Sequence, residues 1–118
     1  MGIDPALGDL DYCYLTTTGR VSGEPREIEI WFALEGPTVY MLSGGGNRSD
    51  WVRNLSREPA VTVRIGDAIY GGMARVVGDP DEDALARRLL PAKYESRYGG
   101  DLSNWRQNAL PVAVDLAE

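Results

Sequence analysis

The fold is decided by the stretch DYCYLTTTGRVSGEPREIEIWFAL, residues 11–34, in which two strand-like runs flank a glycine-containing loop. Aromatic and β-branched residues are frequent in both runs, and residues 26–34 alternate with the period of two that is typical of a β-strand. The isoleucines of this run share one face, whereas Trp31 shares the other with Glu27 and Glu29. We therefore predict a β-hairpin with one face in the core, and a Trp31 whose burial requires a partner or a ligand.

Further strand signals recur along the chain. Apolar, β-branched runs occupy residues 39–43, 60–65, 68–77 and 109–117. The sequence EGPT, residues 35–38, is typical of a turn, and so is GD at residues 66–67. The adjacent glycines Gly71 and Gly72 predict a bulge or a close approach of another backbone. We expect six strands, mostly antiparallel, counted from the runs above.

Two segments have helical periodicity. Residues 49–58 place their apolar side chains on one helical face. The second helix begins with Asp79 as the N-cap and Pro80 at the first helical position, and Pro91 is expected to kink or end it. So many strands in so short a chain leave many sheet edges, so the predicted fold class is mainly β (α+β), closed into a small barrel.

Length and composition predict one domain spanning residues 1–118, because a second core would not fit. No window approaches the roughly 18 apolar residues of a membrane span, and the first residues do not resemble a signal peptide, so we expect a cytoplasmic protein. The single cysteine, Cys13, lies in an apolar strand and has no partner for an internal disulfide. We interpret it as a small buried hydrophobic residue.

The net charge of −6 argues against a nucleic-acid partner, because neutralising phosphates requires a basic surface. We expect at most peripheral contact with a membrane. Residues 1–18 and 65–118 are acidic, whereas residues 19–64 balance six acids with six bases. The middle segment is therefore the best place for an anionic ligand, although the same balance is also typical of an ordinary solvated surface.

The absence of histidine restricts the chemistry most strongly. It excludes Ser-His-Asp and Cys-His catalysis, and with one cysteine it leaves no expected metal site. If the protein is an enzyme, a bound organic cofactor is expected to carry the reactivity, with the protein supplying orientation and electrostatics.

Two loops are candidate anion sites. In the first, Gly19 and Gly23 permit unusual backbone conformations, and Arg20 and Arg26 supply planar donors for an anion. In the second, SGGGNRSDW at residues 43–51, a glycine run enters a helix, but it lacks the residues of a P-loop or a dinucleotide fingerprint. From the loops alone, a hairpin turn and a flexible connection are the favoured interpretations.

Aromatic residues could line a pocket for a flat ring, since their surfaces combine apolar area with a polar edge. The candidates are Trp31, Trp51, Trp105, Tyr94 and Tyr98. Trp51 fits the core by its helix-face companions, which leaves Trp31 as the more informative residue.

The block TTTGRVSGEPR, residues 16–26, followed by WVRNLSREPAVTV at 51–63 and by NWRQNALPVAVDL at 104–116, resembles the deazaflavin-dependent nitroreductase family. The resemblance covers residues 12–116. It implies a split β-barrel related to flavin-binding oxidases, usually a homodimer. It also implies an enzyme that binds reduced coenzyme F420 and passes hydride to quinones, nitroaromatics or activated enones.

Carried over position by position, the resemblance implies roles for individual residues. The first loop would hold the cofactor's phosphate and acidic tail, and the glycine loop would lie beside the deazaflavin. The implied cofactor-binding residues are Arg20, Ser22, Gly23, Arg26, Trp31, Ser43, Gly45, Gly46, Trp51 and Asn54. The implied catalytic residues are Ser43, which would bind the cofactor, and Tyr94 and Tyr98, which would shape the pocket or supply a proton.

Two positions depart from the family pattern, because Val21 and Gly44 stand where the family commonly has lysine. A site with fewer cations suits a smaller anion, so an FMN-dependent reductase or oxidase on the same fold is the alternative. A protein that binds a cofactor or other ligand without turnover is the further alternative from outside enzymes.

Overall fold

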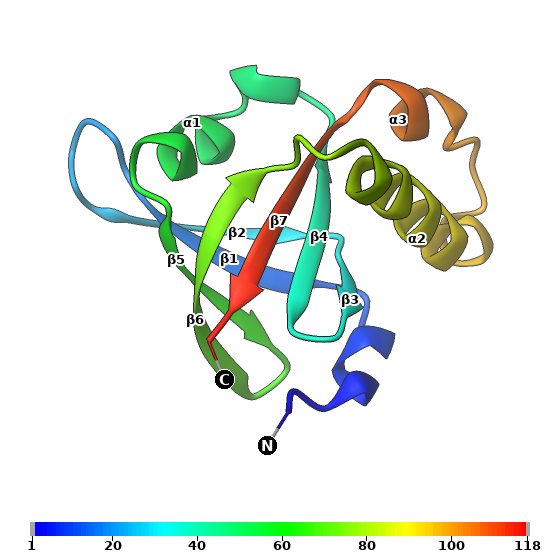
Figure 1. Cartoon of the computed structure of the whole chain (residues 1–118), viewed down its shortest axis with the longest axis horizontal. Coiled ribbons are helices and arrows are strands. Elements are labelled where there is room, and N and C mark those ends of the chain that lie inside the picture. Colours follow the sequence, from blue (N-terminus) through cyan, green and yellow to red (C-terminus); the bar gives the residue numbers. More distant parts are fainter. Residues whose placement is uncertain (1, 118) are drawn as a thin grey trace.

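The computed structural model describes residues 2–117 and places helices around one continuous antiparallel sheet (Figure 1). The strands are β1 (Cys13–Thr18), β2 (Pro25–Ile30), β3 (Ala33–Glu35), β4 (Thr38–Ser43), β5 (Ala60–Ile65), β6 (Ala68–Val76) and β7 (Leu110–Leu116). The helices are the 3₁₀ turns η1 (Pro5–Asp9) and η2 (Gly46–Arg48), and α1 (Asp50–Arg57), α2 (Pro80–Tyr98) and α3 (Ser103–Asn108).

The sheet has seven strands in the order β2-β1-β5-β6-β7-β4-β3, so the prediction of six was wrong. The difference arises in residues 26–34, where the predicted single strand breaks after Ile30 into β2 and β3. These are the two edge strands, and only Trp31 and Phe32 separate them along the chain. The sheet must therefore curl round until its edges meet at this corner. The expected antiparallel, barrel-like architecture is confirmed.

The core lies on both sides of β4. Val39 and Met41 point into the barrel with the apolar face of α1, whereas Tyr40 and Leu42 pack under α2. Figure 1 shows α2 lying across the sheet beside β4 and α1 covering one open end of the barrel. None of the helices within residues 2–117 has both the length and the apolar character needed to cross a membrane.

Helix α2 begins as predicted, with the Asp79 side chain accepting the N–H of Glu82 at 3.0 Å. It continues through Pro91 to Tyr98 and is capped by Gly99. The prediction was that Pro91 would kink or end the helix, and the second of these outcomes is wrong. Proline removes one backbone hydrogen bond, but Pro91 itself and the neighbouring Leu90 are buried against the sheet. Tertiary packing therefore holds the helix where local preference disfavours it.

The interpretation of the glycine pair in β6 is confirmed as a close backbone approach rather than a bulge. The register of β5 against β6 runs without interruption past Gly71 and Gly72. A Cβ atom on Gly72 would lie 2.7 Å from Cγ1 of Val114 and 2.8 Å from the backbone oxygen of Asp115. Cys13 is fully buried, and burial raises the pKa of its thiol to about 12, as expected for an inert residue.

A cluster of charged side chains links α2 to the sheet. Arg75 of β6 contacts Glu82 of α2 and, at 2.8 Å from Nε to Oδ2, Asp115 of β7. Glu82 also accepts a 2.6 Å hydrogen bond from the hydroxyl of Tyr40. These partners hold the pKa of the Glu82 carboxyl at about 2, below its usual 4.5. The charged form of Glu82 therefore stabilises the fold.

We expect Glu82→Gln to lower the free energy of unfolding by roughly 1–2 kcal/mol, since the cluster is only partly buried. A carboxyl whose pKa is lowered on folding contributes fully above the unfolded value near 4.5. That contribution is lost as the pH falls from there towards 2. Urea unfolding at pH 7 and at pH 3 should show a smaller loss on acidification in the variant than in the wild type. Glu95→Gln, at an exposed position of the same helix, serves as the control.

Candidate functional site

The loop between β1 and β2 is a tight hairpin turn closed by its own backbone hydrogen bonds. The N–H of Gly19 donates to the carbonyl of Glu24, and the N–H of Gly23 donates to that of Gly19, each at 2.8 Å. Gly23 has a φ of 73°, which favours glycine. A Cβ atom on Gly19 would lie 2.8 Å from Oγ of Ser22 and 3.2 Å from the carbonyl oxygen of Glu24, so the turn favours glycine at both positions.

The side chain of Arg20 extends from this loop and contacts helix α1. Its backbone N–H and Nη1 both donate to Oδ1 of Asn54, at 3.1 and 2.9 Å, and its Nη2 lies 3.1 Å from Oδ1 of Asp50. Asn54 is 4% exposed, and its amide nitrogen donates to Oγ1 of the buried Thr17. A buried amide of one helix therefore fixes the position of the loop and of its arginine.

We expect Asn54→Ala to lower the free energy of unfolding by about 2 kcal/mol, because it leaves the Arg20 N–H and the Thr17 hydroxyl without this partner. Asn54→Asp should lose less than half as much, since a carboxylate accepts both bonds from Arg20. Urea unfolding of the two variants measures the difference, with Asn47→Ala as an exposed control. Equal losses in the two Asn54 variants would show that the acceptor oxygen is unimportant.

Arg26 carries a charge that no acid of the described chain neutralises. Its Nη2 lies 3.3 Å from Oγ of Ser22, and it takes part in none of the ion pairs found among residues 2–117. With Arg20 it lines a first depression of about 410 Å³ between the loop, β2 and α1. The other residues lining it are Thr17, Gly19, Val21, Ser22, Ile28, Asp50, Trp51 and Asn54.

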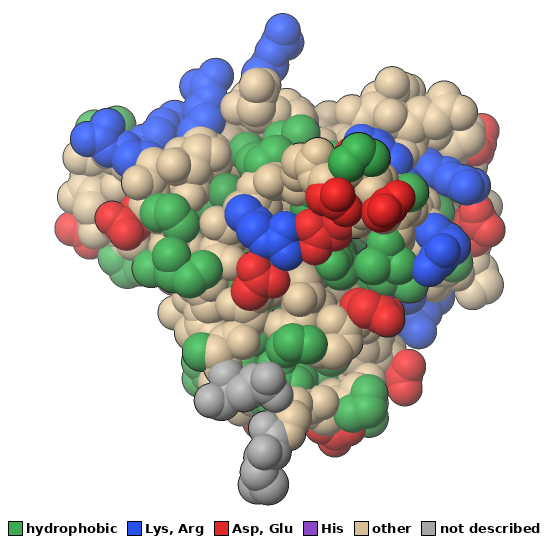
Figure 2. Space-filling view, in the orientation of Figure 1, with side chains coloured by type: hydrophobic (Ala, Val, Ile, Leu, Met, Phe, Trp, Pro, Cys, Tyr) green, Lys and Arg blue, Asp and Glu red, His purple; other side chains and the backbone are tan. Residues whose placement is uncertain are grey.

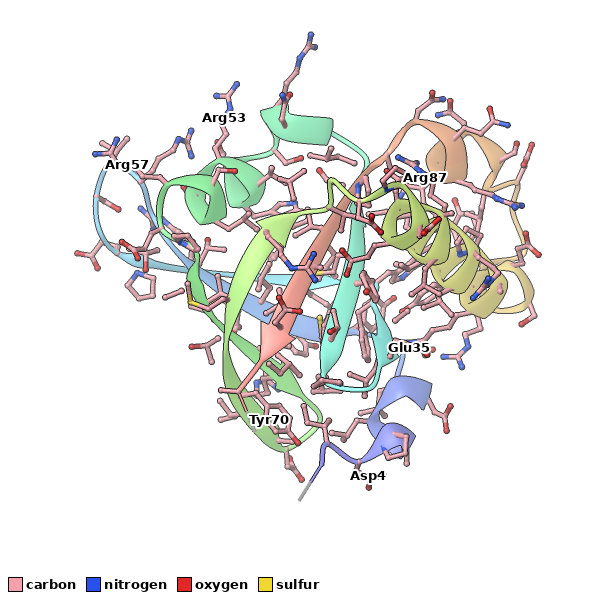
Figure 3. The ribbon with its side chains drawn as sticks, in the orientation of Figure 1. Asp4, Glu35, Arg53, Arg57, Tyr70 and Arg87 are labelled. Atoms are coloured by element: carbon pink, nitrogen blue, oxygen red, sulfur yellow. The ribbon has the colours of Figure 1, made fainter. Side chains whose placement is uncertain are left out.

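The surface around this first depression is basic although the chain is acidic overall. Figure 2 shows basic side chains gathered over α1 and the adjoining loop. Arg53 and Arg57 extend from α1 into solvent at this end of the molecule (Figure 3). Asp50 is the one acid among the residues lining the depression, and because its side chain is 83% exposed, its pairing with Arg20 is weak.

The glycine-rich loop after β4 is held in shape by hydrogen bonds of its two serine hydroxyls. Ser43 is 2% exposed, and its Oγ donates to the carbonyl of Gly46 and lies 2.9 Å from Oγ of Ser49. A Cβ atom on Gly45 would lie 2.4 Å from that Ser49 oxygen, and Gly46 has a φ of 61°. The Ser43 hydroxyl is therefore occupied within the loop, which lies between α1 and Trp105.

Aromatic side chains from three elements meet at the corner between β2 and β3. Trp31 stacks on Tyr94 of α2, with ring centroids 4.2 Å apart and planes within 2° of parallel. Tyr98 of α2 and Trp105 of α3 lie edge-on to the ring of Trp31, with ring centroids 5.4 and 5.5 Å from it. Neighbouring helices of the same chain thus supply the partner that Trp31 requires.

The two tyrosines of α2 differ in surroundings. Tyr94 is 1% exposed, and its hydroxyl accepts the N–H of Phe32 at 3.0 Å and lies 2.7 Å from the carbonyl of Asp11. Burial raises the pKa of this hydroxyl to about 12. Tyr98 is 59% exposed. Of the two, only Tyr98 offers its hydroxyl to a ligand.

A second depression, of about 500 Å³, opens beside this aromatic cluster. Its lining residues are Tyr12, Glu29, Ile30, Trp31, Leu42, Tyr98, Asp101, Leu102, Asn104 and Trp105. Ile28 lines the first depression and Ile30 the second, and residues two apart lie on the same face of a strand. The two depressions are therefore neighbours along β2.

The structure divides the predicted site residues into groups. The first depression contains Arg20, Ser22, Arg26, Trp51 and Asn54, and the second contains Trp31 and Tyr98. Gly23, Ser43, Gly45, Gly46 and Tyr94 support the surrounding loops and the corner without lining either. The sequence analysis assigned no site role to Tyr12, Glu29, Asp101 or Asn104, which also line the second depression. Among residues 2–117, no group of three or more potential ligand side chains forms a metal site.

Comparison with known proteins agrees with this geometry. The chain belongs to the F420H2-dependent quinone reductase family, whose model matches residues 3–117. It is therefore an oxidoreductase with coenzyme F420 as its cofactor. An F420H2-dependent quinone reductase of Mycobacterium tuberculosis is 29% identical over 104 residues, which cover 85% of this chain and 69% of the relative.

Solved structures confirm the fold. An F420-H2 dependent reductase aligns with a TM-score of 0.72 at 20% identity, over 88% of this chain and 93% of its own. A structure described as a domain-swapped dimer aligns with a TM-score of 0.71 at 22% identity, over 88% of this chain and 79% of its own.

The residues of the two depressions fit a flat ring that carries an anionic tail. Arg26 has no acidic partner in the described chain, and the ion pair of Arg20 is open to solvent, so both can receive an anion. The second depression offers indole and phenol rings beside Ile30 and Leu42. The cofactor assigned by the family is thus compatible with what these residues provide.

Proposed function

We propose that this F420-dependent reductase acts on flat electrophiles, namely quinones, nitroaromatics or activated enones, and that the described residues form one cofactor-binding domain. The observation that supports this most strongly is the position of a cationic depression beside an aromatic one along β2. When bound, the reduced deazaflavin supplies hydride.

In this proposal the chain's residues bind and orient rather than react. Arg20, Ser22 and Arg26 hold the anionic part of the cofactor, because guanidinium groups suit phosphate and carboxylate. Trp31 is kept rigid by Tyr94 and gives the ring system a fixed surface. Correct placement of donor and acceptor is a large contribution to rate on its own, which agrees with a chain that has no histidine.

The remaining proposed roles follow from position. Trp51 and Asn54 shape the wall of the first depression on α1. Gly45 and Gly46 keep the loop after β4 compact, and Ser43 holds it closed. Tyr98, at the rim of the second depression, is the side chain placed to donate a proton to a reduced product.

The test is titration of the purified protein with F420, followed by deazaflavin fluorescence, together with oxidation of F420H2 in the presence of menadione. Saturable micromolar binding and quinone-dependent oxidation are expected, with FMN as the control cofactor. Binding without oxidation across quinones, nitroaromatics and enones would contradict the proposed substrates. It would favour a protein that holds its cofactor without turnover.

We also infer that the chain forms a homodimer. The outer face of β6 leaves Ile69 66% and Met73 55% exposed, on either side of Gly71. Apolar side chains grouped on an open sheet face are typical of an interaction surface. Sedimentation equilibrium of the wild type and of Met73→Glu tests this, and a wild-type monomer at micromolar concentration would contradict it.

A further inference from the structure

The second depression is acidic, in contrast to the first. Two of its lining residues, Glu29 and Asp101, are carboxylates, and none is lysine or arginine. The first depression holds two arginines and one aspartate. Neighbouring sites of one small domain thus have opposite charge, so they suit different ligands or different parts of one ligand.

Asp101 is held in place as a charged group. Its Oδ1 accepts the N–H of Ser103 at 2.9 Å and the Ser103 hydroxyl at 2.7 Å. These hydrogen bonds lower the pKa of the Asp101 carboxyl below its usual value. The charged form of Asp101 is therefore favoured by its surroundings.

Glu29, the second carboxylate, lies on β2. Its Oε2 accepts a hydrogen bond of 2.5 Å from the hydroxyl of Tyr14, the residue paired with it across β1. That bond fixes the direction of the side chain and leaves Oε1 without a partner within the described chain. The two carboxylates come from β2 and from the segment before α3.

Aromatic rings line the rest of this depression. Tyr12, Trp31, Tyr98 and Trp105 contribute rings from four different parts of the chain. The faces of such rings carry negative partial charge and attract cations, an effect that strengthens as water is excluded. Aromatic rings combined with carboxylates are what a protein needs to bind a flat or alkylated organic cation.

We propose that the second depression, which the acceptor shares with the ring of the cofactor, selects cationic, nitrogen-containing aromatic electrophiles, such as N-alkylated quinolinium rings, over neutral and anionic rings of the same size. The binding preference stands on Glu29, Asp101 and the rings around them. The claim that such cations are reduced rests in addition on the proposed function.

The reduction balances without an acidic group of the protein. Hydride adds to a ring carbon of the cation and forms a C–H bond, giving a neutral dihydro product. The reduced cofactor loses that hydride and one proton, and the proton passes to solvent. A quinone, by contrast, must take up both the hydride and a proton. A cationic acceptor therefore suits a site with no histidine.

The binding test uses the protein without cofactor and follows quenching of tryptophan fluorescence. The probes are N-methylquinolinium, neutral quinoline at pH 8 and anionic 2-naphthoate, which are similar in size. We expect the cation to bind about tenfold more tightly than quinoline, and 2-naphthoate to bind more weakly than either. The advantage of the cation should decrease as salt is raised from 20 to about 300 mM.

Glu29→Gln/Asp101→Asn should reduce the cation's advantage to about twofold and leave quinoline binding unchanged. Asp67→Asn/Asp81→Asn removes the same charge at exposed positions outside the depression and should leave the advantage intact. Equal binding of cation and quinoline by the wild type would overturn the proposal. So would an unchanged advantage in the Glu29/Asp101 variant.

Turnover is measured separately, as oxidation of F420H2 by N-methylquinolinium and by menadione. Reduction of both, with the cation more sensitive to the Glu29/Asp101 variant, supports the proposal. Reduction of menadione alone would refute the acceptor class while the proposed function stands. Failure of both acceptors despite selective cation binding would instead refute the proposed function.

Discussion

Tyr94→Ala is expected to lower the free energy of unfolding by roughly 3–5 kcal/mol, the range for removing a large buried aromatic side chain. Tyr94 is among the largest fully buried side chains. Its ring supports Trp31, and its hydroxyl contacts the backbone of Phe32 and Asp11. It therefore holds the corner at which the two edges of the sheet meet.

Tyr94→Phe separates the hydroxyl from the ring. It should lower the free energy of unfolding by roughly 1–3 kcal/mol, because the N–H of Phe32 loses its acceptor in a buried position. The Phe32 carbonyl keeps a partner, since Nζ of Lys93 donates to it at 2.8 Å. Tyr98→Ala, at a mostly exposed position of the same helix, is the control and should change stability by less than 1 kcal/mol.

Urea unfolding followed by tryptophan fluorescence measures these variants, and far-ultraviolet circular dichroism checks that each is folded. The order of loss should be alanine, then phenylalanine, then the Tyr98 control. If Tyr94→Phe were as stable as the wild type, the corner would be held by packing alone. The hydrogen bonds at Phe32 would then have no net effect.

The break at this corner shows where local sequence information ends. Strand-forming residues run from Arg26 to Leu34, with Ile28, Phe32 and Leu34 on one face, so the pattern correctly predicts strand on both sides of Trp31. The Phe32 N–H at this bend is bound by the hydroxyl of Tyr94, 62 positions away. Pro91 is the reverse case, because packing overrides a clear local signal for ending the helix. Both errors have the same cause, namely contacts between elements distant in sequence.

The sequence predicted the types of residue at the candidate site better than it predicted how they are arranged in space. The arginines and glycines of the first loop, and the aromatic residues of the second half, stand out in the sequence. Their separation into a basic and an acidic depression depends on which strands pair. Glu29 and Asp101 gave no signal, because single acids in an acidic chain resemble ordinary surface residues. The hydrogen bond from Nη1 of Arg20 to Oδ1 of Asn54 joins residues that are 34 positions apart.

Arg20→Ala/Arg26→Ala is expected to weaken F420 binding by about 100-fold, since each guanidinium group contributes roughly 1.5 kcal/mol of charged hydrogen bonding at a partly exposed site. The fold should remain intact. The backbone N–H of residue 20 still donates to Asn54, and the hairpin is closed by bonds between Gly19, Gly23 and Glu24. Deazaflavin fluorescence titration measures the Kd, and thermal unfolding confirms the structure.

Two further variants show whether this effect is specific to the first depression. Arg57→Ala/Arg88→Ala removes the same charge from exposed positions outside it, and should weaken binding less than threefold at physiological salt. Asp50→Asn should have the opposite effect on the Kd for F420. It frees Arg20 from its carboxylate partner and should therefore tighten binding several-fold. An unchanged Kd in the Arg20/Arg26 variant would mean that the loop after β1 is only a hairpin turn. The cofactor's anionic groups would then have to bind elsewhere, with the exposed arginines of α1 as the nearest remaining cations.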